Sequence, residues 1–293
     1  MRLLLCLMAV GLFAAPVPPA HTVKPFGADF PNLDSLATAA WWEPRGAAKG
    51  KKKGAGPTAP PTMVVERDQV IAFALYTQQD GVLKLSAQLY PLYPDESKEV
   101  RLEFKRDDRW VEAAKTDVVF PGWSAHFRIT GWDGSKDVAY RVRHGEKAAF
   151  EGLVRRDPKE KETIVVANMS CNSSRTTGAR PEILDNLLRQ DPDLLFFAGD
   201  QTYRHTEHTA GWIEFGLQFR EVMKDRPTIC IPDDHDVGHP NLWGEDGKLS
   251  TAPGNADGGY MFPVAYVNMV QRQQSWHLPD AFDPTPVKRG ISV

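Results

Sequence analysis

Residues 194–203, Leu-Leu-Phe-Phe-Ala-Gly-Asp-Gln-Thr-Tyr, decide the fold of this chain. The apolar run 194–198 has the length of a buried strand, and Gly199-Asp200 ends it with a turn. Similar short runs lie at 164–167 and 228–231. Apolar residues at helical spacing separate the three runs: Ile183, Leu184, Leu187 and Leu188 after the first, and Trp212, Phe215, Phe219 and Val222 after the second. This alternation of strand and helix predicts a layered α/β domain with parallel strands.

The region before this domain has a different pattern. Apolar and polar residues alternate over 83–89 and 100–105, the period expected for half-buried strands. Further strands are predicted at 70–76, 125–130 and 138–143, with Gly-containing turns between them. Several short strands with close turns predict a β-sandwich.

Each of the three predicted α/β strands ends in side chains that bind metals. In open α/β sheets, sites form at the carboxyl ends of the strands. The first strand is followed by Cys171 and Asn172, the second by Asp200 and Tyr203, and the third by Asp233, Asp234, His235 and Asp236. We therefore expect Asp200 and Asp234 to point into one cleft, with Tyr203 and Cys171 beside Asp200.

These residue types match the needs of phosphate-ester hydrolysis. The reaction needs a hydroxide at neutral pH, neutralisation of the phosphoryl oxygens and a proton for the leaving group, and two metals supply the first two. Asp200 is the natural bridge between the metals, and Tyr203 and a Cys171 thiolate can complete the ligand set of a trivalent iron. Asp234 suits the second metal and His235 suits the general acid.

Other roles remain open for several of these residues. His235 could itself be a metal ligand, and Asp233 and Asp234 could only cap a turn. Arg175, close after the first ligand, is a candidate for gripping the phosphate or forms an ordinary surface pair. The i, i+3 spacing of His205 and His208 would put both on one helical face, where they could line the mouth of the pocket. We favour the alternative that they are exposed loop histidines.

The motifs Ser170-Cys171-Asn172, Gly199-Asp200-Gln201-Thr202-Tyr203 and Asp233-Asp234-His235-Asp236 together resemble the PhoD-type alkaline phosphatases and phosphodiesterases. This family belongs to the calcineurin-like metallophosphoesterase superfamily. The resemblance implies an incomplete α/β metallophosphoesterase-type layered sandwich preceded by an all-β sandwich domain. It also implies a dinuclear site of Fe³⁺ and Ca²⁺, with Cys171, Asp200, Tyr203 and Asp234 as ligands and His235 as the acid.

Two departures from the family pattern accompany the resemblance. Asp236 stands where the family often has Glu, a change that we expect to touch no predicted ligand. Family members also carry later His and Asp ligands on a second sheet, whereas no such motif follows His235 before Val293. We therefore expect a C-terminally truncated fragment.

The N-terminus has the pattern of an export signal. Arg2 precedes an apolar run, 3–15, that is too short to span a bilayer; a buried N-terminal helix is the alternative. The predicted divisions are a signal peptide over 1–20, a linker or extended segment over 21–62, a PhoD N-terminal-like β-sandwich over 63–157 and a truncated catalytic domain over 163–293. Within the second division, 44–61 is dominated by Gly, Ala, Lys and Pro, a composition typical of a flexible linker.

The composition limits the possible partners of the chain, and its cysteines limit the possible disulfides. The chain is 42% hydrophobic and 25% charged with a net charge of -3, so no nucleic-acid-binding surface is evident, and no membrane span is expected after signal removal. Loss of the signal would leave Cys171 and Cys230, which could pair in an exported protein; we expect Cys171 to bind metal and Cys230 to be a buried thiol.

These patterns together predict a periplasmic or secreted metallophosphoesterase acting on phosphate mono- or diesters. The alternative is a non-catalytic exported binding protein with a vestigial, truncated phosphoesterase domain. Later metal motifs in the full gene would favour the enzyme.

Overall fold

The computed structural model describes residues 24–38, 65–173, 180–238, 241–244 and 247–281. The predicted signal peptide over 1–20 and the Gly/Ala/Lys/Pro segment over 44–61 lie outside these ranges. Among the described helices, none is both long enough and apolar enough to cross a membrane.

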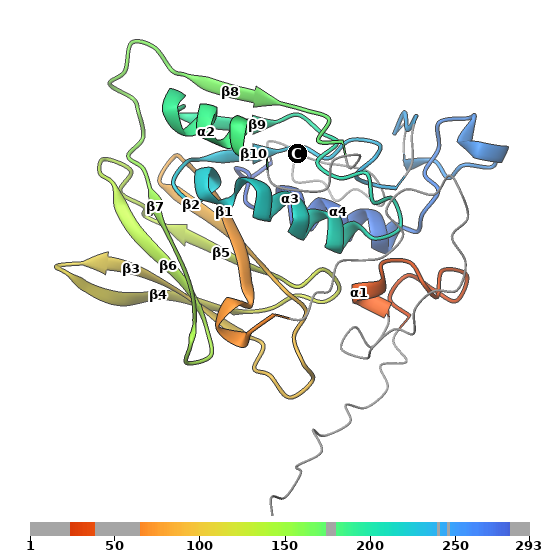
Figure 1. The fold of residues 1–293 in the computed structure, drawn as a ribbon, viewed down its shortest axis with the longest axis horizontal. Helices are drawn as coiled ribbons and strands as arrows, with labels where there is room; N and C mark the ends of the chain where they lie inside the picture. Colours follow the sequence, from red (N-terminus) through yellow and green to blue (C-terminus); the bar gives the residue numbers. More distant parts are fainter. Residues whose placement is uncertain (1–23, 39–64, 174–179, 239–240, 245–246, 282–293) are drawn as a thin grey trace, which may run out of the picture.

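Seven antiparallel strands form two sheets in the first part of the described chain (Figure 1). One sheet has the order β1-β2-β5 and contains β1 (Ile71–Gln79), β2 (Val82–Leu89) and β5 (Ser124–Thr130). The other has the order β4-β3-β6-β7 and contains β4 (Arg109–Asp117), β3 (Glu99–Arg106), β6 (Val138–His144) and β7 (Ala148–Val154). The five strands predicted from the sequence are all present, and β4 and β7 are additional. On β2, Leu83, Leu85 and Ala87 are fully buried, as the alternation requires.

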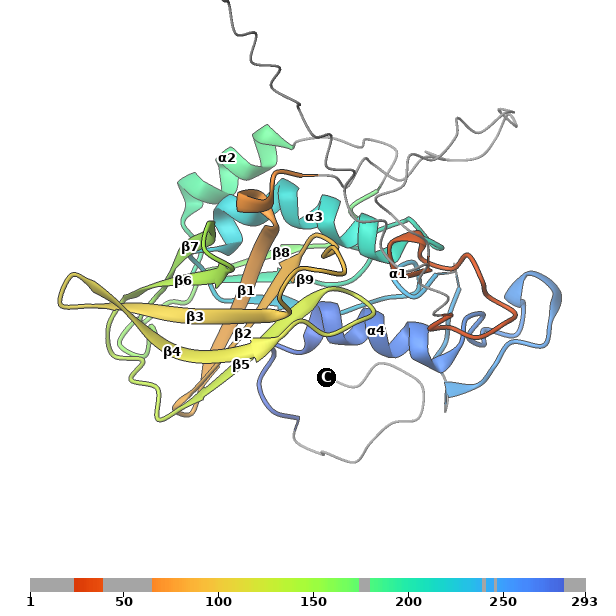
Figure 2. The same cartoon turned by 90° about the horizontal axis from the view of Figure 1, so that it is seen from below.

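A three-stranded parallel sheet follows, with the order β10-β9-β8. Its strands are β8 (Val166–Met169), β9 (Leu194–Phe197) and β10 (Thr228–Cys230). Helices α2 (Pro181–Gln190) and α3 (His208–Met223) lie on one side of these strands and α4 (Val264–Ser275) lies on the other (Figure 2). The sheet and its helices confirm the predicted α/β layering, although α4 had no counterpart in the sequence prediction.

Helix α3 joins the parallel and antiparallel parts through apolar packing. Its predicted stripe is buried, and the Trp212 ring meets Phe73 of β1 edge-on with 5.3 Å between centroids. One turn further, Gly216 leaves room for the same ring, because a Cβ there would lie 1.9 Å from Phe73. No strand of the antiparallel sheets pairs with β8, β9 or β10 among the described residues, yet one apolar cluster runs through all of them. The domain division between 157 and 163 stays a prediction.

The N-terminal segment 24–38, which includes the short helix α1 (Ser35–Thr38), packs against the α/β part. Phe26 and Leu33 enter a second apolar cluster together with residues from α4 and the loops before it. Asp34 is fully buried, and its Oδ2 accepts hydrogen bonds from the Thr209 N–H at 3.2 Å and the Thr209 Oγ1 at 2.6 Å. Asp34 therefore anchors this segment to the first turn of α3.

Stability should depend on pH through Asp34. Burial, opposed by the Thr209 hydrogen bond and reinforced by Glu207, raises the pKa of Asp34 from 3.8 to about 7. Between these values the unfolded chain has lost the Asp34 proton and the folded chain still holds it, so raising the pH through this window favours unfolding. Across this window the free energy of unfolding should fall by an amount on the order of 4 kcal/mol, at about 1.4 kcal/mol per pKa unit.

Asp34→Asn should remove this dependence, so denaturant unfolding of parent and variant from pH 4 to pH 8 measures it. We expect the parent to lose stability relative to the variant as the pH rises. Other buried acids are present in both proteins and their effects cancel in the difference. Parallel stability curves for the two proteins would contradict the prediction.

Candidate metal and catalytic site

The loops after β8, β9 and β10 lie together at the carboxyl ends of the parallel strands. The Cys171 N–H donates to the Gly199 carbonyl at 3.2 Å, and the Asn172 N–H donates to the Asp200 carbonyl at 2.8 Å. Cys171 and Asp200 both have left-handed backbone conformations, with φ of 57° and 58°. Such conformations are uncommon for residues with side chains and gather at functional sites.

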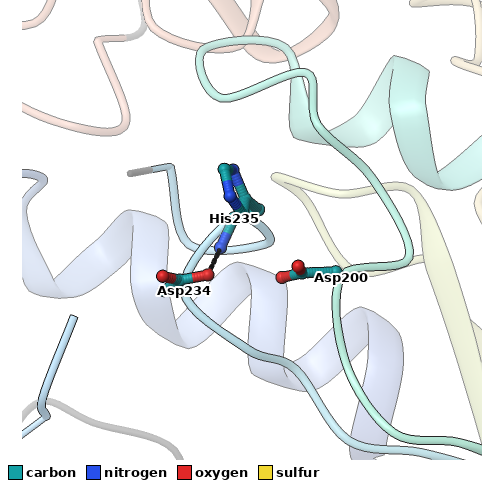
Figure 3. Close-up of side chains that lie close together, drawn as sticks. All are labelled: Asp200, Asp234 and His235. Atoms are coloured by element: carbon teal, nitrogen blue, oxygen red, sulfur yellow. Dashed lines mark hydrogen bonds between the residues drawn. The ribbon is translucent and has the colours of Figure 1, made fainter. Parts of the chain in front are cut away.

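Asp200, Asp234 and His235 form a group that could hold a cation. One potential ligand atom from each residue lies within 4.8 Å of the others. Figure 3 shows the two carboxylates close together, on two different loops. Asp200 is 7% exposed, and its Oδ1 is buried without a hydrogen-bond partner. A buried carboxylate oxygen without a donor is costly unless a cation lies against it, so these residues fit a metal ion.

The Asp234 carboxylate is held in place by backbone donors. Its Oδ1 accepts the His235 N–H at 2.7 Å, the contact drawn in Figure 3, and its Oδ2 accepts the Asn241 N–H at 2.6 Å. The Asp234 N–H in turn donates to Asp233 Oδ1 at 2.8 Å. Asp233 thus supports the loop, while Asp234 faces Asp200.

Tyr203 and Cys171 lie beside Asp200, in the arrangement expected from the sequence. The Tyr203 hydroxyl donates to Asp200 Oδ2 at 2.8 Å, and the Cys171 thiol adjoins the same hydroxyl. Burial and the Asp200 carboxylate raise the pKa of Tyr203, and burial raises the pKa of Asp200. Tyr203 is therefore a phenol here, and a metal ligated by its oxygen would have to displace that proton.

His235 packs against two aromatic rings. Its ring centroid lies 4.2 Å from that of Tyr203 and 4.9 Å from that of His205. His205 Nε2 is also 2.7 Å from His235 Nδ1. His205 is half-buried and belongs to the site, so the expectation of an exposed loop residue was wrong. His208 is fully buried at the start of α3, and His205 precedes that helix, so the two histidines do not share a helical face.

Asp236 also belongs to the site, contrary to the expectation that it touches no predicted ligand. Its side chain is buried, with the residue 1% exposed, and its Oδ2 accepts the Asp200 N–H at 2.8 Å. Burial raises the pKa of Asp236 to about 7, while the hydrogen bonds from backbone N–H groups act in the opposite direction. The sequence could not predict the contact between Asp236 and Asp200, because the two residues lie on loops after different strands.

Cys171 and Cys230 are both free thiols. Cys171 is exposed at the end of β8, and its Sγ lies 3.2 Å from Ser170 Oγ. Cys230 is buried within β10, and burial raises the pKa of its thiol. The prediction that the two do not form a disulfide is confirmed. Arg175, the candidate phosphate contact, lies outside the described residues.

The two thiols should differ sharply in reactivity. Reaction with iodoacetamide requires access to the sulfur atom. Cys171 is exposed, whereas Cys230 is buried and its burial raises the pKa of the thiol. In the native metal-free protein we expect Cys171 to be alkylated at least about 100-fold faster than Cys230, measured by peptide mass spectrometry. Cys230 should react only after denaturant is added. Equal rates in the native protein would contradict the structure.

The structure of PhoD superposes with a TM-score of 0.56 and 14% sequence identity, covering 75% of this chain and 48% of the PhoD chain. This chain folds like PhoD. This likeness of fold agrees with the family that the sequence motifs indicated. The chain spans about half the length of the PhoD chain that it matches.

A second similar structure is the purple acid phosphatase PPD1 isolated from yellow lupin (Lupinus luteus) seeds. It has a TM-score of 0.49 and 13% identity, covering 71% of this chain and 40% of the phosphatase. No protein-family model and no curated protein matches the sequence. The likeness to PhoD therefore rests on the arrangement of the chain in space.

Proposed function

We propose that this chain carries the metal-binding site of an exported phosphoesterase that hydrolyses phosphate mono- or diesters. The observation that supports this most is the buried, partnerless Oδ1 of Asp200, which lies beside Asp234 and His235. The PhoD-like fold, with these residues at the carboxyl ends of parallel strands, supports the same conclusion.

Asp200 would bridge two metals, with Tyr203 and Cys171 on one side of it and Asp234 on the other. A phenolate and a thiolate favour a trivalent iron, and carboxylate oxygens favour a harder ion such as Ca²⁺. When bound, the metals would supply the charge that lowers the pKa of water and neutralises the phosphoryl oxygens.

His235 would donate the proton to the leaving alcohol. Its Nδ1 is engaged by His205, so donation falls to Nε2. The Tyr203 and His205 rings restrict its rotation, which keeps the donor in one place. Arg175, the candidate from the sequence, would bind the phosphate.

Metal analysis combined with activity assays tests this proposal. The protein would be loaded with Fe³⁺ and Ca²⁺ and assayed with p-nitrophenyl phosphate and bis(p-nitrophenyl) phosphate. We expect metal-dependent hydrolysis of at least one ester and a visible absorption band from phenolate or thiolate bound to iron. A protein that binds no metal and hydrolyses neither ester would support a non-catalytic binding protein instead.

A further inference from the structure

The Asp236 carboxylate accepts more hydrogen bonds than the side chain of any predicted metal ligand does. Its Oδ2 accepts backbone N–H groups of Asp200 at 2.8 Å, Gln201 at 3.3 Å and Asp233 at 3.0 Å. Its Oδ1 accepts the Thr202 N–H at 3.0 Å and the Gln274 Nε2 at 3.0 Å. All five donors thus converge on one buried carboxylate.

These donors come from three separate elements. Asp200, Gln201 and Thr202 lie in the loop after β9, and Asp233 lies in the loop after β10. Gln274 reaches the carboxylate from α4 on the far side of the sheet. One oxygen, Oδ2, therefore ties together the two loops that carry Asp200 and Asp234.

We propose that Asp236 is a positioning residue that sets the distance between the Asp200 and Asp234 carboxylates before any metal binds. This inference rests on the proposed function, because it assigns Asp236 to the metal site described there. Asp236 does not ligate metal itself, since its two oxygens face the N–H donors. Groups that orient metal ligands typically contribute a factor of about 10 to 100 to metal affinity.

Only a carboxylate satisfies all five donors. In Asp236→Asn, one of the two oxygens becomes an NH₂ group that faces N–H donors. The Gln274 amide can turn over, since its Oε1 is buried without a partner, but the Thr202 N–H belongs to the backbone and cannot. Whichever way the new amide faces, at least one loop amide loses its acceptor and is pushed away.

Calorimetric titration with Mn²⁺ tests the proposal in the parent, Asp236→Asn and Asp236→Glu. The control is Asp193→Asn, because Asp193 Oδ2 likewise accepts a backbone N–H, that of Val165 at 3.0 Å, but at the opposite end of the strands. We expect Asp236→Asn to weaken Mn²⁺ binding about 10- to 100-fold and Asp193→Asn to leave it unchanged. Asp236→Glu, which keeps the charge, should bind at least about 5-fold more tightly than Asp236→Asn.

Amide hydrogen exchange of the metal-free parent tests the positioning role of Asp236 without relying on a variant that has to fold. The amides of Asp200, Gln201 and Thr202 lie in a loop and should still be strongly protected, because Asp236 accepts all three. Rapid exchange of these amides, or Mn²⁺ affinity unchanged in a folded Asp236→Asn protein, would overturn the positioning role. A parent that binds no Mn²⁺ but protects these amides would count against the proposed function and leave the loop-positioning role supported.

Discussion

Replacing Asp200 with Asn should abolish metal binding and leave a protein at least as stable as the parent. The change removes the charge of the proposed bridging ligand while keeping its shape. We expect the Mn²⁺ affinity to fall more than about 100-fold, which is more than the loss expected when a group that only orients a metal ligand is removed. Any metal-dependent hydrolysis should fall by about 10³-fold or more. Calorimetry and phosphatase assays on the same preparation measure both effects.

The stability of this variant separates a functional role from a structural one. Burial raises the pKa of Asp200, because the buried surroundings disfavour its charged form and that form destabilises the folded metal-free protein. An amide carries no such charge, and functional sites often gain stability when their special groups are removed. Melting temperature without metal should therefore stay equal or rise. A folded Asp200→Asn protein that binds Mn²⁺ like the parent would contradict the assignment.

Replacing His235 with Gln should slow hydrolysis most for esters whose leaving group has to be protonated as it departs. A positioned general acid contributes about 10²- to 10⁴-fold. For an alkyl phosphate, whose leaving group is a poor one, we expect a loss in that range. For p-nitrophenyl phosphate, whose leaving group departs readily, the loss should be about 10-fold or smaller. The ratio of kcat/KM for the two esters measures the effect.

Metal binding by the same variant decides between the two roles open to His235. If His235 is the general acid, His235→Gln should change the Mn²⁺ affinity by no more than about 5-fold. This change is smaller than the loss expected when a group that orients a metal ligand is removed. A loss of more than about 100-fold would make it a ligand, as its place in the cation-binding group allows. A matched control is His144→Gln, in the antiparallel sheet, where the ring contacts the Ser97 carbonyl. An equal loss with both esters would contradict the role as acid.

The elements with strong periodicity were predictable from the sequence. Alternation identified strands such as β2 because the apolar residues at every second position are buried, and the α3 stripe of large apolar residues is buried as expected. Strand β4 escaped because most of it is exposed at the edge of its sheet. Helix α4 escaped because both apolar and polar residues, including Gln273 and Gln274, are buried along it.

The ligand types were predictable because they directly follow strand ends, whereas the contacts that support them were not. Cys171 follows β8, and Asp200 and Tyr203 follow β9, so their grouping could be inferred from the parallel topology alone. The contact of His205 with His235 depends on the path of an irregular loop, and that of Asp236 with Asp200 depends on the spacing of two loops. Neither leaves a periodic signal in the sequence.

Anomalous scattering from crystals soaked in Mn²⁺ would locate the metal site. We expect a Mn²⁺ peak within about 2.5 Å of both Asp200 Oδ1 and an Asp234 oxygen, at the carboxyl ends of β9 and β10. Tyr203 and Cys171 should border the same density. Full occupancy elsewhere, with no peak beside Asp200, would contradict the assignment of this site.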